Sequence, residues 1–140
     1  MSSFSIDEKR PPMIKAVLDA SALLAFFKEE PLSYDLEALL SQAVMSTVNA
    51  CEVATIMMRL GMPKEEIDSL INETIKDIIV FDRELSLLTA HLWKSTKAYG
   101  LSLGDRACIA LGQQLNLPIY TADTIWKNIQ LENVDIRLIR

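Results

Sequence analysis

Short apolar runs alternate along the chain with longer stretches in which apolar residues recur at helical spacing. The runs at residues 16–18, 43–45, 78–81 and 119–120 have the composition of parallel strands that are buried on both faces. Residues 134–138 instead alternate apolar and charged side chains, which is typical of an edge strand with one exposed face. The pattern therefore predicts about five strands.

Helical patterns fill the intervals between these strands. Gly61 and Gly100 end two of the helices, and Pro63 stands at the first turn of another. Strands that alternate with helices predict right-handed crossovers and a parallel sheet covered on both faces. We therefore expect a single three-layer α/β/α domain over residues 15–140, with a central, mostly parallel sheet, after a flexible tail at residues 1–14. The predicted helices are residues 21–29, 33–42, 47–60, 63–74, 83–99 and 104–115.

Composition removes several kinds of chemistry from consideration. The 140 residues include one histidine, and the two cysteines form no C-x-x-C motif, so a zinc knuckle or a disulfide framework is not expected. The four glycines form neither a dinucleotide-binding fingerprint nor a phosphate-binding loop. No apolar run is long enough for a membrane helix and no signal peptide is evident, so we expect a cytoplasmic protein. The net charge of −5 argues against broad adhesion to nucleic acid but leaves room for a local basic patch.

Four carboxylates occupy informative positions in this pattern. Asp19 and Asp123 follow the first and fourth predicted strands, while Glu52 and Asp105 lie in the early turns of two helices. Ligands bind open α/β sheets beyond the carboxyl ends of the strands. Since strand ends and helix beginnings belong at that edge, we expect the four acids to converge on one pocket.

Each acid also has a purely structural interpretation. Asp19 and Asp123 are suited to cap the turns that follow them, and Ser102 with Asp105 matches a capping box. Glu52 is explained equally well as a solvated helix residue. Taken together, however, four adjacent acids would repel one another unless a divalent cation bound between them. Mg²⁺ or Mn²⁺ suits such an all-oxygen site, which in turn suits hydrolysis of a phosphodiester by water.

Four segments around these acids occur in order along the chain: Val-Leu-Asp-Ala-Ser-Ala-Leu (17–23), Asn-Ala-Cys-Glu (49–52), Leu-Gly-Asp-Arg-Ala-Cys-Ile-Ala (103–110) and Ile-Tyr-Thr-Ala-Asp (119–123). Together they resemble the PIN domain, and the resemblance runs from about Lys15 to the C-terminus. A stand-alone PIN domain of this length is most similar to the VapC toxins of prokaryotic toxin–antitoxin pairs. The resemblance implies a metal-dependent ribonuclease, an RNA substrate, an antitoxin protein as partner and a homodimer.

The resemblance assigns roles to individual residues. Asp19, Glu52, Asp105 and Asp123 match the acidic quartet of the family, which implies that they are its catalytic residues and ligands of Mg²⁺ or Mn²⁺. Small polar residues that support the acids or the phosphate are implied at Ser21, Asn49 and Thr121, although capping and turn roles explain these three equally well. The quartet is intact, whereas the role of Arg106 stays open.

Two other functions remain as alternatives. One is a PIN-fold module that binds RNA or protein without turnover. The other is a phosphoryl-transfer domain with an aspartate nucleophile, which is disfavoured because Ala20 and Ser21, rather than a second acid, follow Asp19. Five scattered basic residues are suited to an RNA path, but solubility accounts for them equally well: Lys28, Arg59, Lys94, Lys97 and Lys127. Surplus apolar residues on the helices fit the core, a groove for a partner helix, or a dimer contact.

Overall fold

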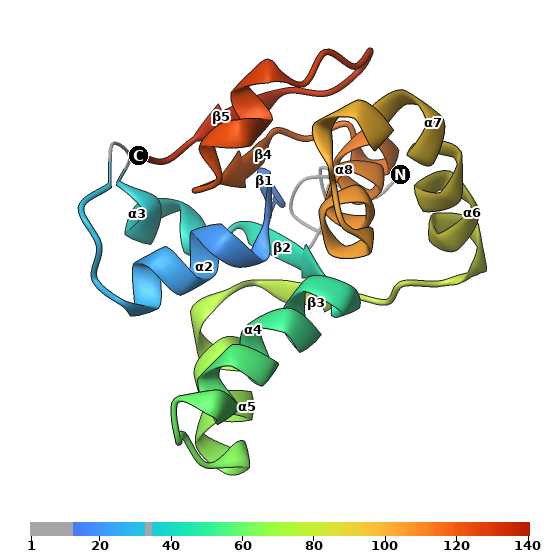
Figure 1. Ribbon diagram of the computed structural model, residues 1–140. Helices are drawn as coiled ribbons and strands as arrows, with labels where there is room; N and C mark the ends of the chain where they lie inside the picture. Colours follow the sequence, from blue (N-terminus) through green and yellow to red (C-terminus); the bar gives the residue numbers. More distant parts are fainter. Residues whose placement is uncertain (1–12, 33–34) are drawn as a thin grey trace, which may run out of the picture.

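A computed structural model describes residues 13–32 and 35–140. The chain folds into helices packed around a central sheet (Figure 1). The elements in chain order are β1 (Ala16–Leu18), α2 (Ala20–Phe27), α3 (Leu36–Leu40), β2 (Ala43–Ser46), α4 (Thr47–Arg59), α5 (Lys64–Thr74), β3 (Asp77–Ile79), α6 (Arg83–His91), α7 (Trp93–Thr96), the 3₁₀ helix η1 (Lys97–Tyr99), α8 (Leu103–Leu115), β4 (Ile119–Thr121), the 3₁₀ helix η2 (Thr124–Asn128) and β5 (Ile136–Leu138).

The five strands pair in the order β3-β2-β1-β4-β5, and every pairing is parallel. After β1 the chain places β2 and then β3 on one side of β1. It then crosses back and places β4 on the other side of β1. The strand order therefore reverses between β1 and β4, and a crevice for ligands forms at such a switch point. The predicted parallel sheet is confirmed, as is the edge position of the strand near the C-terminus.

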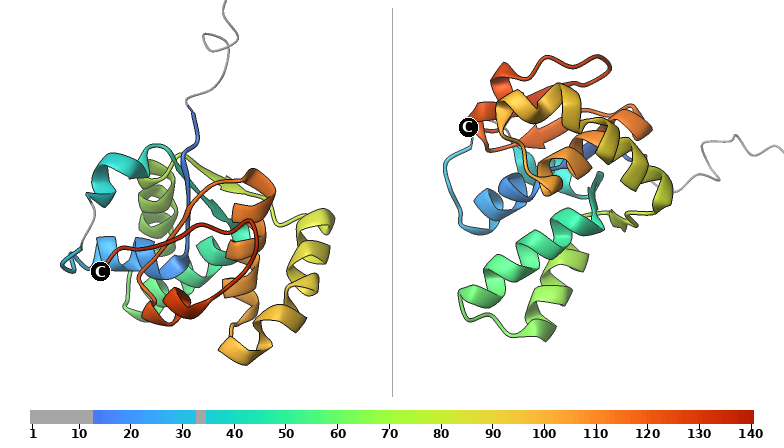
Figure 2. Two further views of the ribbon diagram at one scale, coloured as in Figure 1. Left: turned by 90° about the horizontal axis from the view of Figure 1, so that it is seen from above. Right: turned by 45° about the vertical axis from the view of Figure 1, so that its right-hand side comes forward.

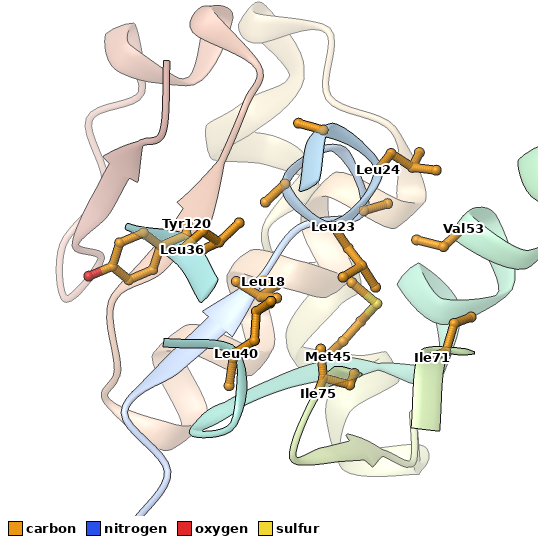
Figure 3. Packing of buried hydrophobic residues seen from close by; sticks show 14 of the residues in the cluster. Leu18, Leu23, Leu24, Leu36, Leu40, Met45, Val53, Ile71, Ile75 and Tyr120 are labelled. Atoms are coloured by element: carbon orange, nitrogen blue, oxygen red, sulfur yellow. The ribbon is translucent and has the colours of Figure 1, made fainter. Parts of the chain in front are cut away.

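Alternate residues of the strands contribute to opposite faces of the sheet. Leu18, Met45 and Tyr120 pack with α2, α3, α4 and α5 in one apolar cluster (Figure 3). Val17 and Ile119 face the other way. Because successive side chains of a strand point to opposite faces, a short and wholly apolar strand needs helices on both sides.

The second face is covered mainly by α6 and α8. Leu85 from α6 and Ile109 and Leu111 from α8 pack there with Trp126 from η2, and all four side chains are almost completely buried. The three layers predicted from the sequence are thereby complete. Within the described residues, no helix is long and apolar enough to cross a membrane.

The prediction of one continuous helix after β3 is wrong. The sequence predicts a single helix over residues 83–99, whereas the structure divides it into α6, α7 and η1. The hydroxyls of Thr96 and Ser95 donate to the carbonyl oxygen of Leu92, at 2.6 and 3.3 Å. Side-chain hydroxyls that bond to helix carbonyls bend or interrupt a helix. Gly100 then ends η1 in the left-handed conformation, at φ 68°.

Other differences from the sequence predictions are small. The third strand is Asp77–Ile79 rather than residues 78–81, and the helix predicted over residues 33–42 is described only from Asp35 onward. The predicted N-terminal tail lies outside the described residues except for Met13 and Ile14. Ile14 packs against the second apolar cluster.

Candidate functional site

Asp19 lies at the switch point, directly after β1 and beside the end of β4. Its backbone N–H donates to the carbonyl of Tyr120, which extends the pairing of the two strands. The hydroxyls of Ser21 and Thr121 both donate to Asp19 Oδ2, at 2.6 and 2.9 Å. Ser21 Oγ also accepts the N–H of Ala122 at 2.9 Å, so the hydroxyls are themselves fixed. The structure thus brings two of the predicted polar residues against the first acid.

Burial governs the chemistry of this carboxyl group. The Asp19 side chain is only 4% exposed, and loss of hydration raises its pKa to about 6. The hydrogen bonds from Ser21 and Thr121 lower that pKa, while the negative charges of Asp105 and Glu52 raise it further. A carboxyl group with a pKa higher in the folded than in the unfolded chain destabilises the fold once it ionises. The free energy of unfolding therefore falls as pH rises from about 4 to about 6.

Asn49 holds Glu52 in a defined orientation. The Asn49 side chain is fully buried, and its Nδ2 donates to Glu52 Oε1 at 2.9 Å and to the carbonyl of Gly104 at 3.0 Å. Since both neighbouring oxygens are hydrogen-bond acceptors, the amide group must point its Nδ2, rather than its Oδ1, toward them. The opposite oxygen, Asn49 Oδ1, is buried and has no hydrogen-bond partner in the part of the chain that the structure describes.

Gly104 provides the space in which the Glu52 carboxylate lies. A Cβ atom built on Gly104 would be 2.5 Å from Glu52 Oε1 and 2.6 Å from its Cδ, which is closer than van der Waals contact permits. The absence of a side chain at the start of α8 therefore allows the carboxylate of α4 to approach α8 directly. The sequence-based prediction did not include this role of Gly104. The signal was a glycine inside a helix, where it costs about 1 kcal/mol relative to alanine.

Asp105 caps its own helix, as the sequence predicts. Its Oδ2 accepts the N–H of Ser102 at 3.0 Å, and Ser102 Oγ accepts the N–H of Asp105 at 3.1 Å, which completes a capping box. The same carboxylate is near enough to Asp19 to raise the pKa of that acid. The neighbouring Arg106 donates to the carbonyl of Thr89 at 3.0 Å and so joins α8 to α6.

The charges of three of the four acids act on the same buried groups, and the fourth acid, Asp123, caps a helix. The pKa of the buried Cys108 thiol is raised first by burial and then by the charges of Asp19, Asp105 and Glu52. Asp123 instead caps η2, since its Oδ1 accepts the N–H of Ile125 at 3.0 Å. Its backbone N–H donates to Thr121 Oγ1 at 3.1 Å.

The chemistry of the oxygen donors fits a hard divalent cation. No hydrogen bond from the described residues reaches Asp19 Oδ1, and the unpaired Asn49 Oδ1 adds a second free oxygen. As the side chains lie, no three acidic, histidine or cysteine residues within 13–32 and 35–140 are arranged to hold a metal ion together. The Asp105 carboxylate instead accepts the N–H of Ser102. Carboxylates without histidine or cysteine favour Mg²⁺ or Mn²⁺.

Solved structures from toxin–antitoxin systems have a similar fold. VapBC2 from Rickettsia felis, bound to a DNA fragment from its promoter, matches with a TM-score of 0.69 and 17% identity, over 89% of this chain and 98% of that one. DNA-bound VapBC from Salmonella typhimurium gives 0.68 and 14%, over 90% and 98%. VapBC-5 from Mycobacterium tuberculosis gives 0.60 and 15%, over 87% and 96%. At these identities the likeness establishes the fold alone.

Comparison at the level of sequence gives the family. A search of curated proteins finds no match. The model of the PIN domain family matches residues 16–131 and so includes the segments that carry all four predicted acids. The resemblance inferred from the sequence is confirmed, because the match spans most of the chain and agrees with the parallel sheet: the protein belongs to the PIN domain family.

Proposed function

We propose that the chain is a metal-dependent endoribonuclease that acts as the toxin of a toxin–antitoxin pair. The observation that carries this proposal is the grouping of Asp19, Glu52 and Asp105 at the switch point, where the charges of the other two raise the pKa of Asp19. Membership of the PIN domain family and the likeness to VapBC structures support a nuclease, and the latter also supports an antitoxin partner. A homodimer is part of the proposal as well.

Each residue has a defined task in this mechanism. Asp19 would hold the cation through its free Oδ1, because Ser21 and Thr121 donate to its other oxygen. Glu52, which Asn49 holds in place, would either help to hold the cation or orient a water and accept its proton. Bound Mg²⁺ or Mn²⁺ would position the phosphodiester, lower the pKa of the attacking water and stabilise the leaving oxygen.

Asp105 completes the proposed ligand set after it leaves its capping position. Asp123, at the end of β4, is proposed as a fourth acid that serves a second ion. Direct attack by water predicts products with 5′-phosphate and 3′-hydroxyl ends.

The test compares the wild type with Asp105→Asn on a pool of structured RNA, in Mg²⁺, in Mn²⁺ and in EDTA. Asp82→Asn is a matched control, because Asp82 also caps a helix but its carboxylate bonds to Leu85 N–H in α6. We expect metal-dependent cleavage by the wild type and by Asp82→Asn, and its loss in Asp105→Asn. Equal cleavage by all three proteins would show that the activity is a contaminant.

A binding module without turnover is the second candidate. The capping bond of Asp105 favours it, because that bond occupies a carboxylate that catalysis needs. Titration calorimetry with Mn²⁺ separates the two candidates, since the nuclease must bind the ion more tightly than Asp105→Asn does. A protein that binds RNA but neither binds Mn²⁺ nor cleaves would establish the module.

A further inference from the structure

Trp93 is an exposed aromatic residue at the start of α7. Its side chain is 56% exposed, whereas the other tryptophan, Trp126, is fully buried. The ammonium group of Lys97 lies 5.1 Å from the centre of the Trp93 ring and holds it in place by a cation–π contact. Tryptophan is enriched at binding interfaces, where its ring contributes a large contact area.

This tryptophan lies at the same edge of the molecule as the acids. α6 and α8 pack against each other, and Arg106, which directly follows Asp105, donates to the carbonyl of Thr89. Trp93 comes four residues after Thr89, a distance of about one helical turn. In the left view of Figure 2, α7 and the beginning of α8 lie at the side of the molecule where β1 leads into α2. A strand bound at the acids would therefore continue past the beginning of α8 toward α7 and the Trp93 ring.

The charge of the segment that carries Trp93 is opposite to that of the whole chain. The sequence has no acidic residue between Glu84 and Asp105, although the net charge is −5. Lys94 and Lys97 are both exposed in this interval. An exposed ring flanked by lysines on an otherwise acidic protein complements a single-stranded nucleic acid, whose bases stack and whose phosphates need cations.

We propose that Trp93, together with Lys94 and Lys97, forms a stacking platform for a base of the single-stranded RNA substrate. The proposal rests on the function proposed above and assigns the lysines to the RNA path rather than to solubility alone. Stacking on an aromatic side chain tolerates any base, so the platform fixes the path of the strand without selecting a sequence.

The test uses the intrinsic fluorescence of Trp93 in EDTA, which prevents metal-dependent cleavage. Trp126→Phe leaves Trp93 as the only tryptophan, and the probe is a single-stranded RNA of mixed sequence, about ten nucleotides long. We expect the RNA to quench Trp93 emission, and a duplex of the same sequence to quench it much less. If Trp126→Phe lowers the melting temperature, the difference between the wild type and Trp93→Phe provides the same signal.

Affinity, measured by anisotropy of a labelled RNA, provides the second readout. We expect Trp93→Ala to weaken binding roughly 10- to 100-fold and Trp93→Phe to keep most of it. Leu87→Ala is the matched control, since Leu87 is 54% exposed on α6 and its loss should leave affinity unchanged. Thermal melting verifies that each variant is folded.

Three results would contradict the proposed stacking platform, and they differ in what they imply for the proposed function. RNA binding that is equal in wild type and Trp93→Ala removes the platform alone. Trp93 emission that depends on protein concentration, with a smaller species in Trp93→Ala, makes the ring a contact between two copies of the chain. Absence of RNA binding by the wild type removes the proposed substrate as well.

Discussion

Gly104 and Gly112 both lie in α8, but a side chain added at each would meet a different neighbour. At Gly104 the new Cβ would be 2.5 Å from Glu52 Oε1, at the free end of a half-buried side chain. At Gly112 it would be 2.5 Å from Ile119 Cγ1, inside the second apolar cluster. Alanine substitutions at these two positions therefore test the candidate site and the apolar core separately.

The expected magnitudes follow from these contacts. In Gly104→Ala the Glu52 carboxylate must move by about 1 Å to regain van der Waals distance, which breaks its bond to Asn49. The lost hydrogen bond costs about 1 kcal/mol for a carboxylate that water can reach, and the helix gains a similar amount from alanine. Stability should stay nearly constant, while displacement of a catalytic group by this distance costs about 100-fold in rate.

Gly112→Ala has the opposite effect. Overpacking against Ile119 costs about 2 kcal/mol, and the gain in helix propensity offsets about half of that. A net loss of about 1 kcal/mol lowers the melting temperature by about 3 °C in a chain of this size. The position of Glu52 is unchanged, so cleavage per folded molecule should equal that of the wild type.

The assay pairs thermal melting with initial rates of RNA cleavage at saturating Mg²⁺, both corrected for folded fraction. Calorimetric titration with Mn²⁺ adds a readout that does not depend on turnover. Full activity in Gly104→Ala would refute the reasoning, because Glu52 would then act without its observed position. A melting temperature in Gly104→Ala far below that of Gly112→Ala would show that the glycine serves packing instead.

Three further predictions concern the buried polar and aromatic groups. Without metal, the wild type should lose about 3 kcal/mol of unfolding free energy as pH rises from about 4 to 7, because the Asp19 pKa of about 6 exceeds its unfolded value of 3.8, and Asp19→Asn should remove this loss. Urea unfolding across this pH range measures the loss, and the same pH dependence in both proteins would assign it to another group. Asn49→Leu has a similar volume but lacks both N–H donors, so it should lower Mn²⁺ affinity and cleavage about 100-fold. Cys51→Ser on the exposed side of the same helix should leave both unchanged; equal titrations of the two variants would show that Glu52 needs no support. Trp126→Ala should lower the free energy of unfolding by about 4 kcal/mol. Trp126→Phe should lower it much less, since the indole N–H has no partner among the described residues. Chemical denaturation measures both variants, and equal losses of stability would mean that the N–H is bonded.

Local sequence chemistry accounts for most of the element boundaries. The capping residues Asp82 and Ser102 and the terminating Gly100 act through neighbours a few residues away, so their patterns are legible without tertiary structure. The break at Leu92 was missed, although its cause is also local. Hydroxyls at Ser95 and Thr96 are compatible with an unbroken helix, and their bonds to the Leu92 carbonyl are evident only in the folded chain.

The positions of the four acids follow only partly from their places near strand ends. The sequence predicts that they share one edge of the sheet, because parallel strands and their following helices must place their ends there. The structure groups Asp19, Glu52 and Asp105 and leaves Asp123 as the cap of η2. Topology determines the edge at which an acid lies, whereas the direction of its carboxylate along that edge depends on the local hydrogen bonds of each loop.

The sequence by itself determined the alternation of strands and helices, the helix caps and the placement of acids at strand ends, because each depends on residues near one another in the chain. Tertiary structure alone decided the raised pKa of Asp19, the fit of Glu52 against Gly104 and the exposure of Trp93. The bond from Asn49 to Gly104 spans 55 residues, and that from Thr121 to Asp19 spans 102. Burial and contact between such distant segments exist only once the sheet has assembled, and they convert a set of carboxylates into a candidate site.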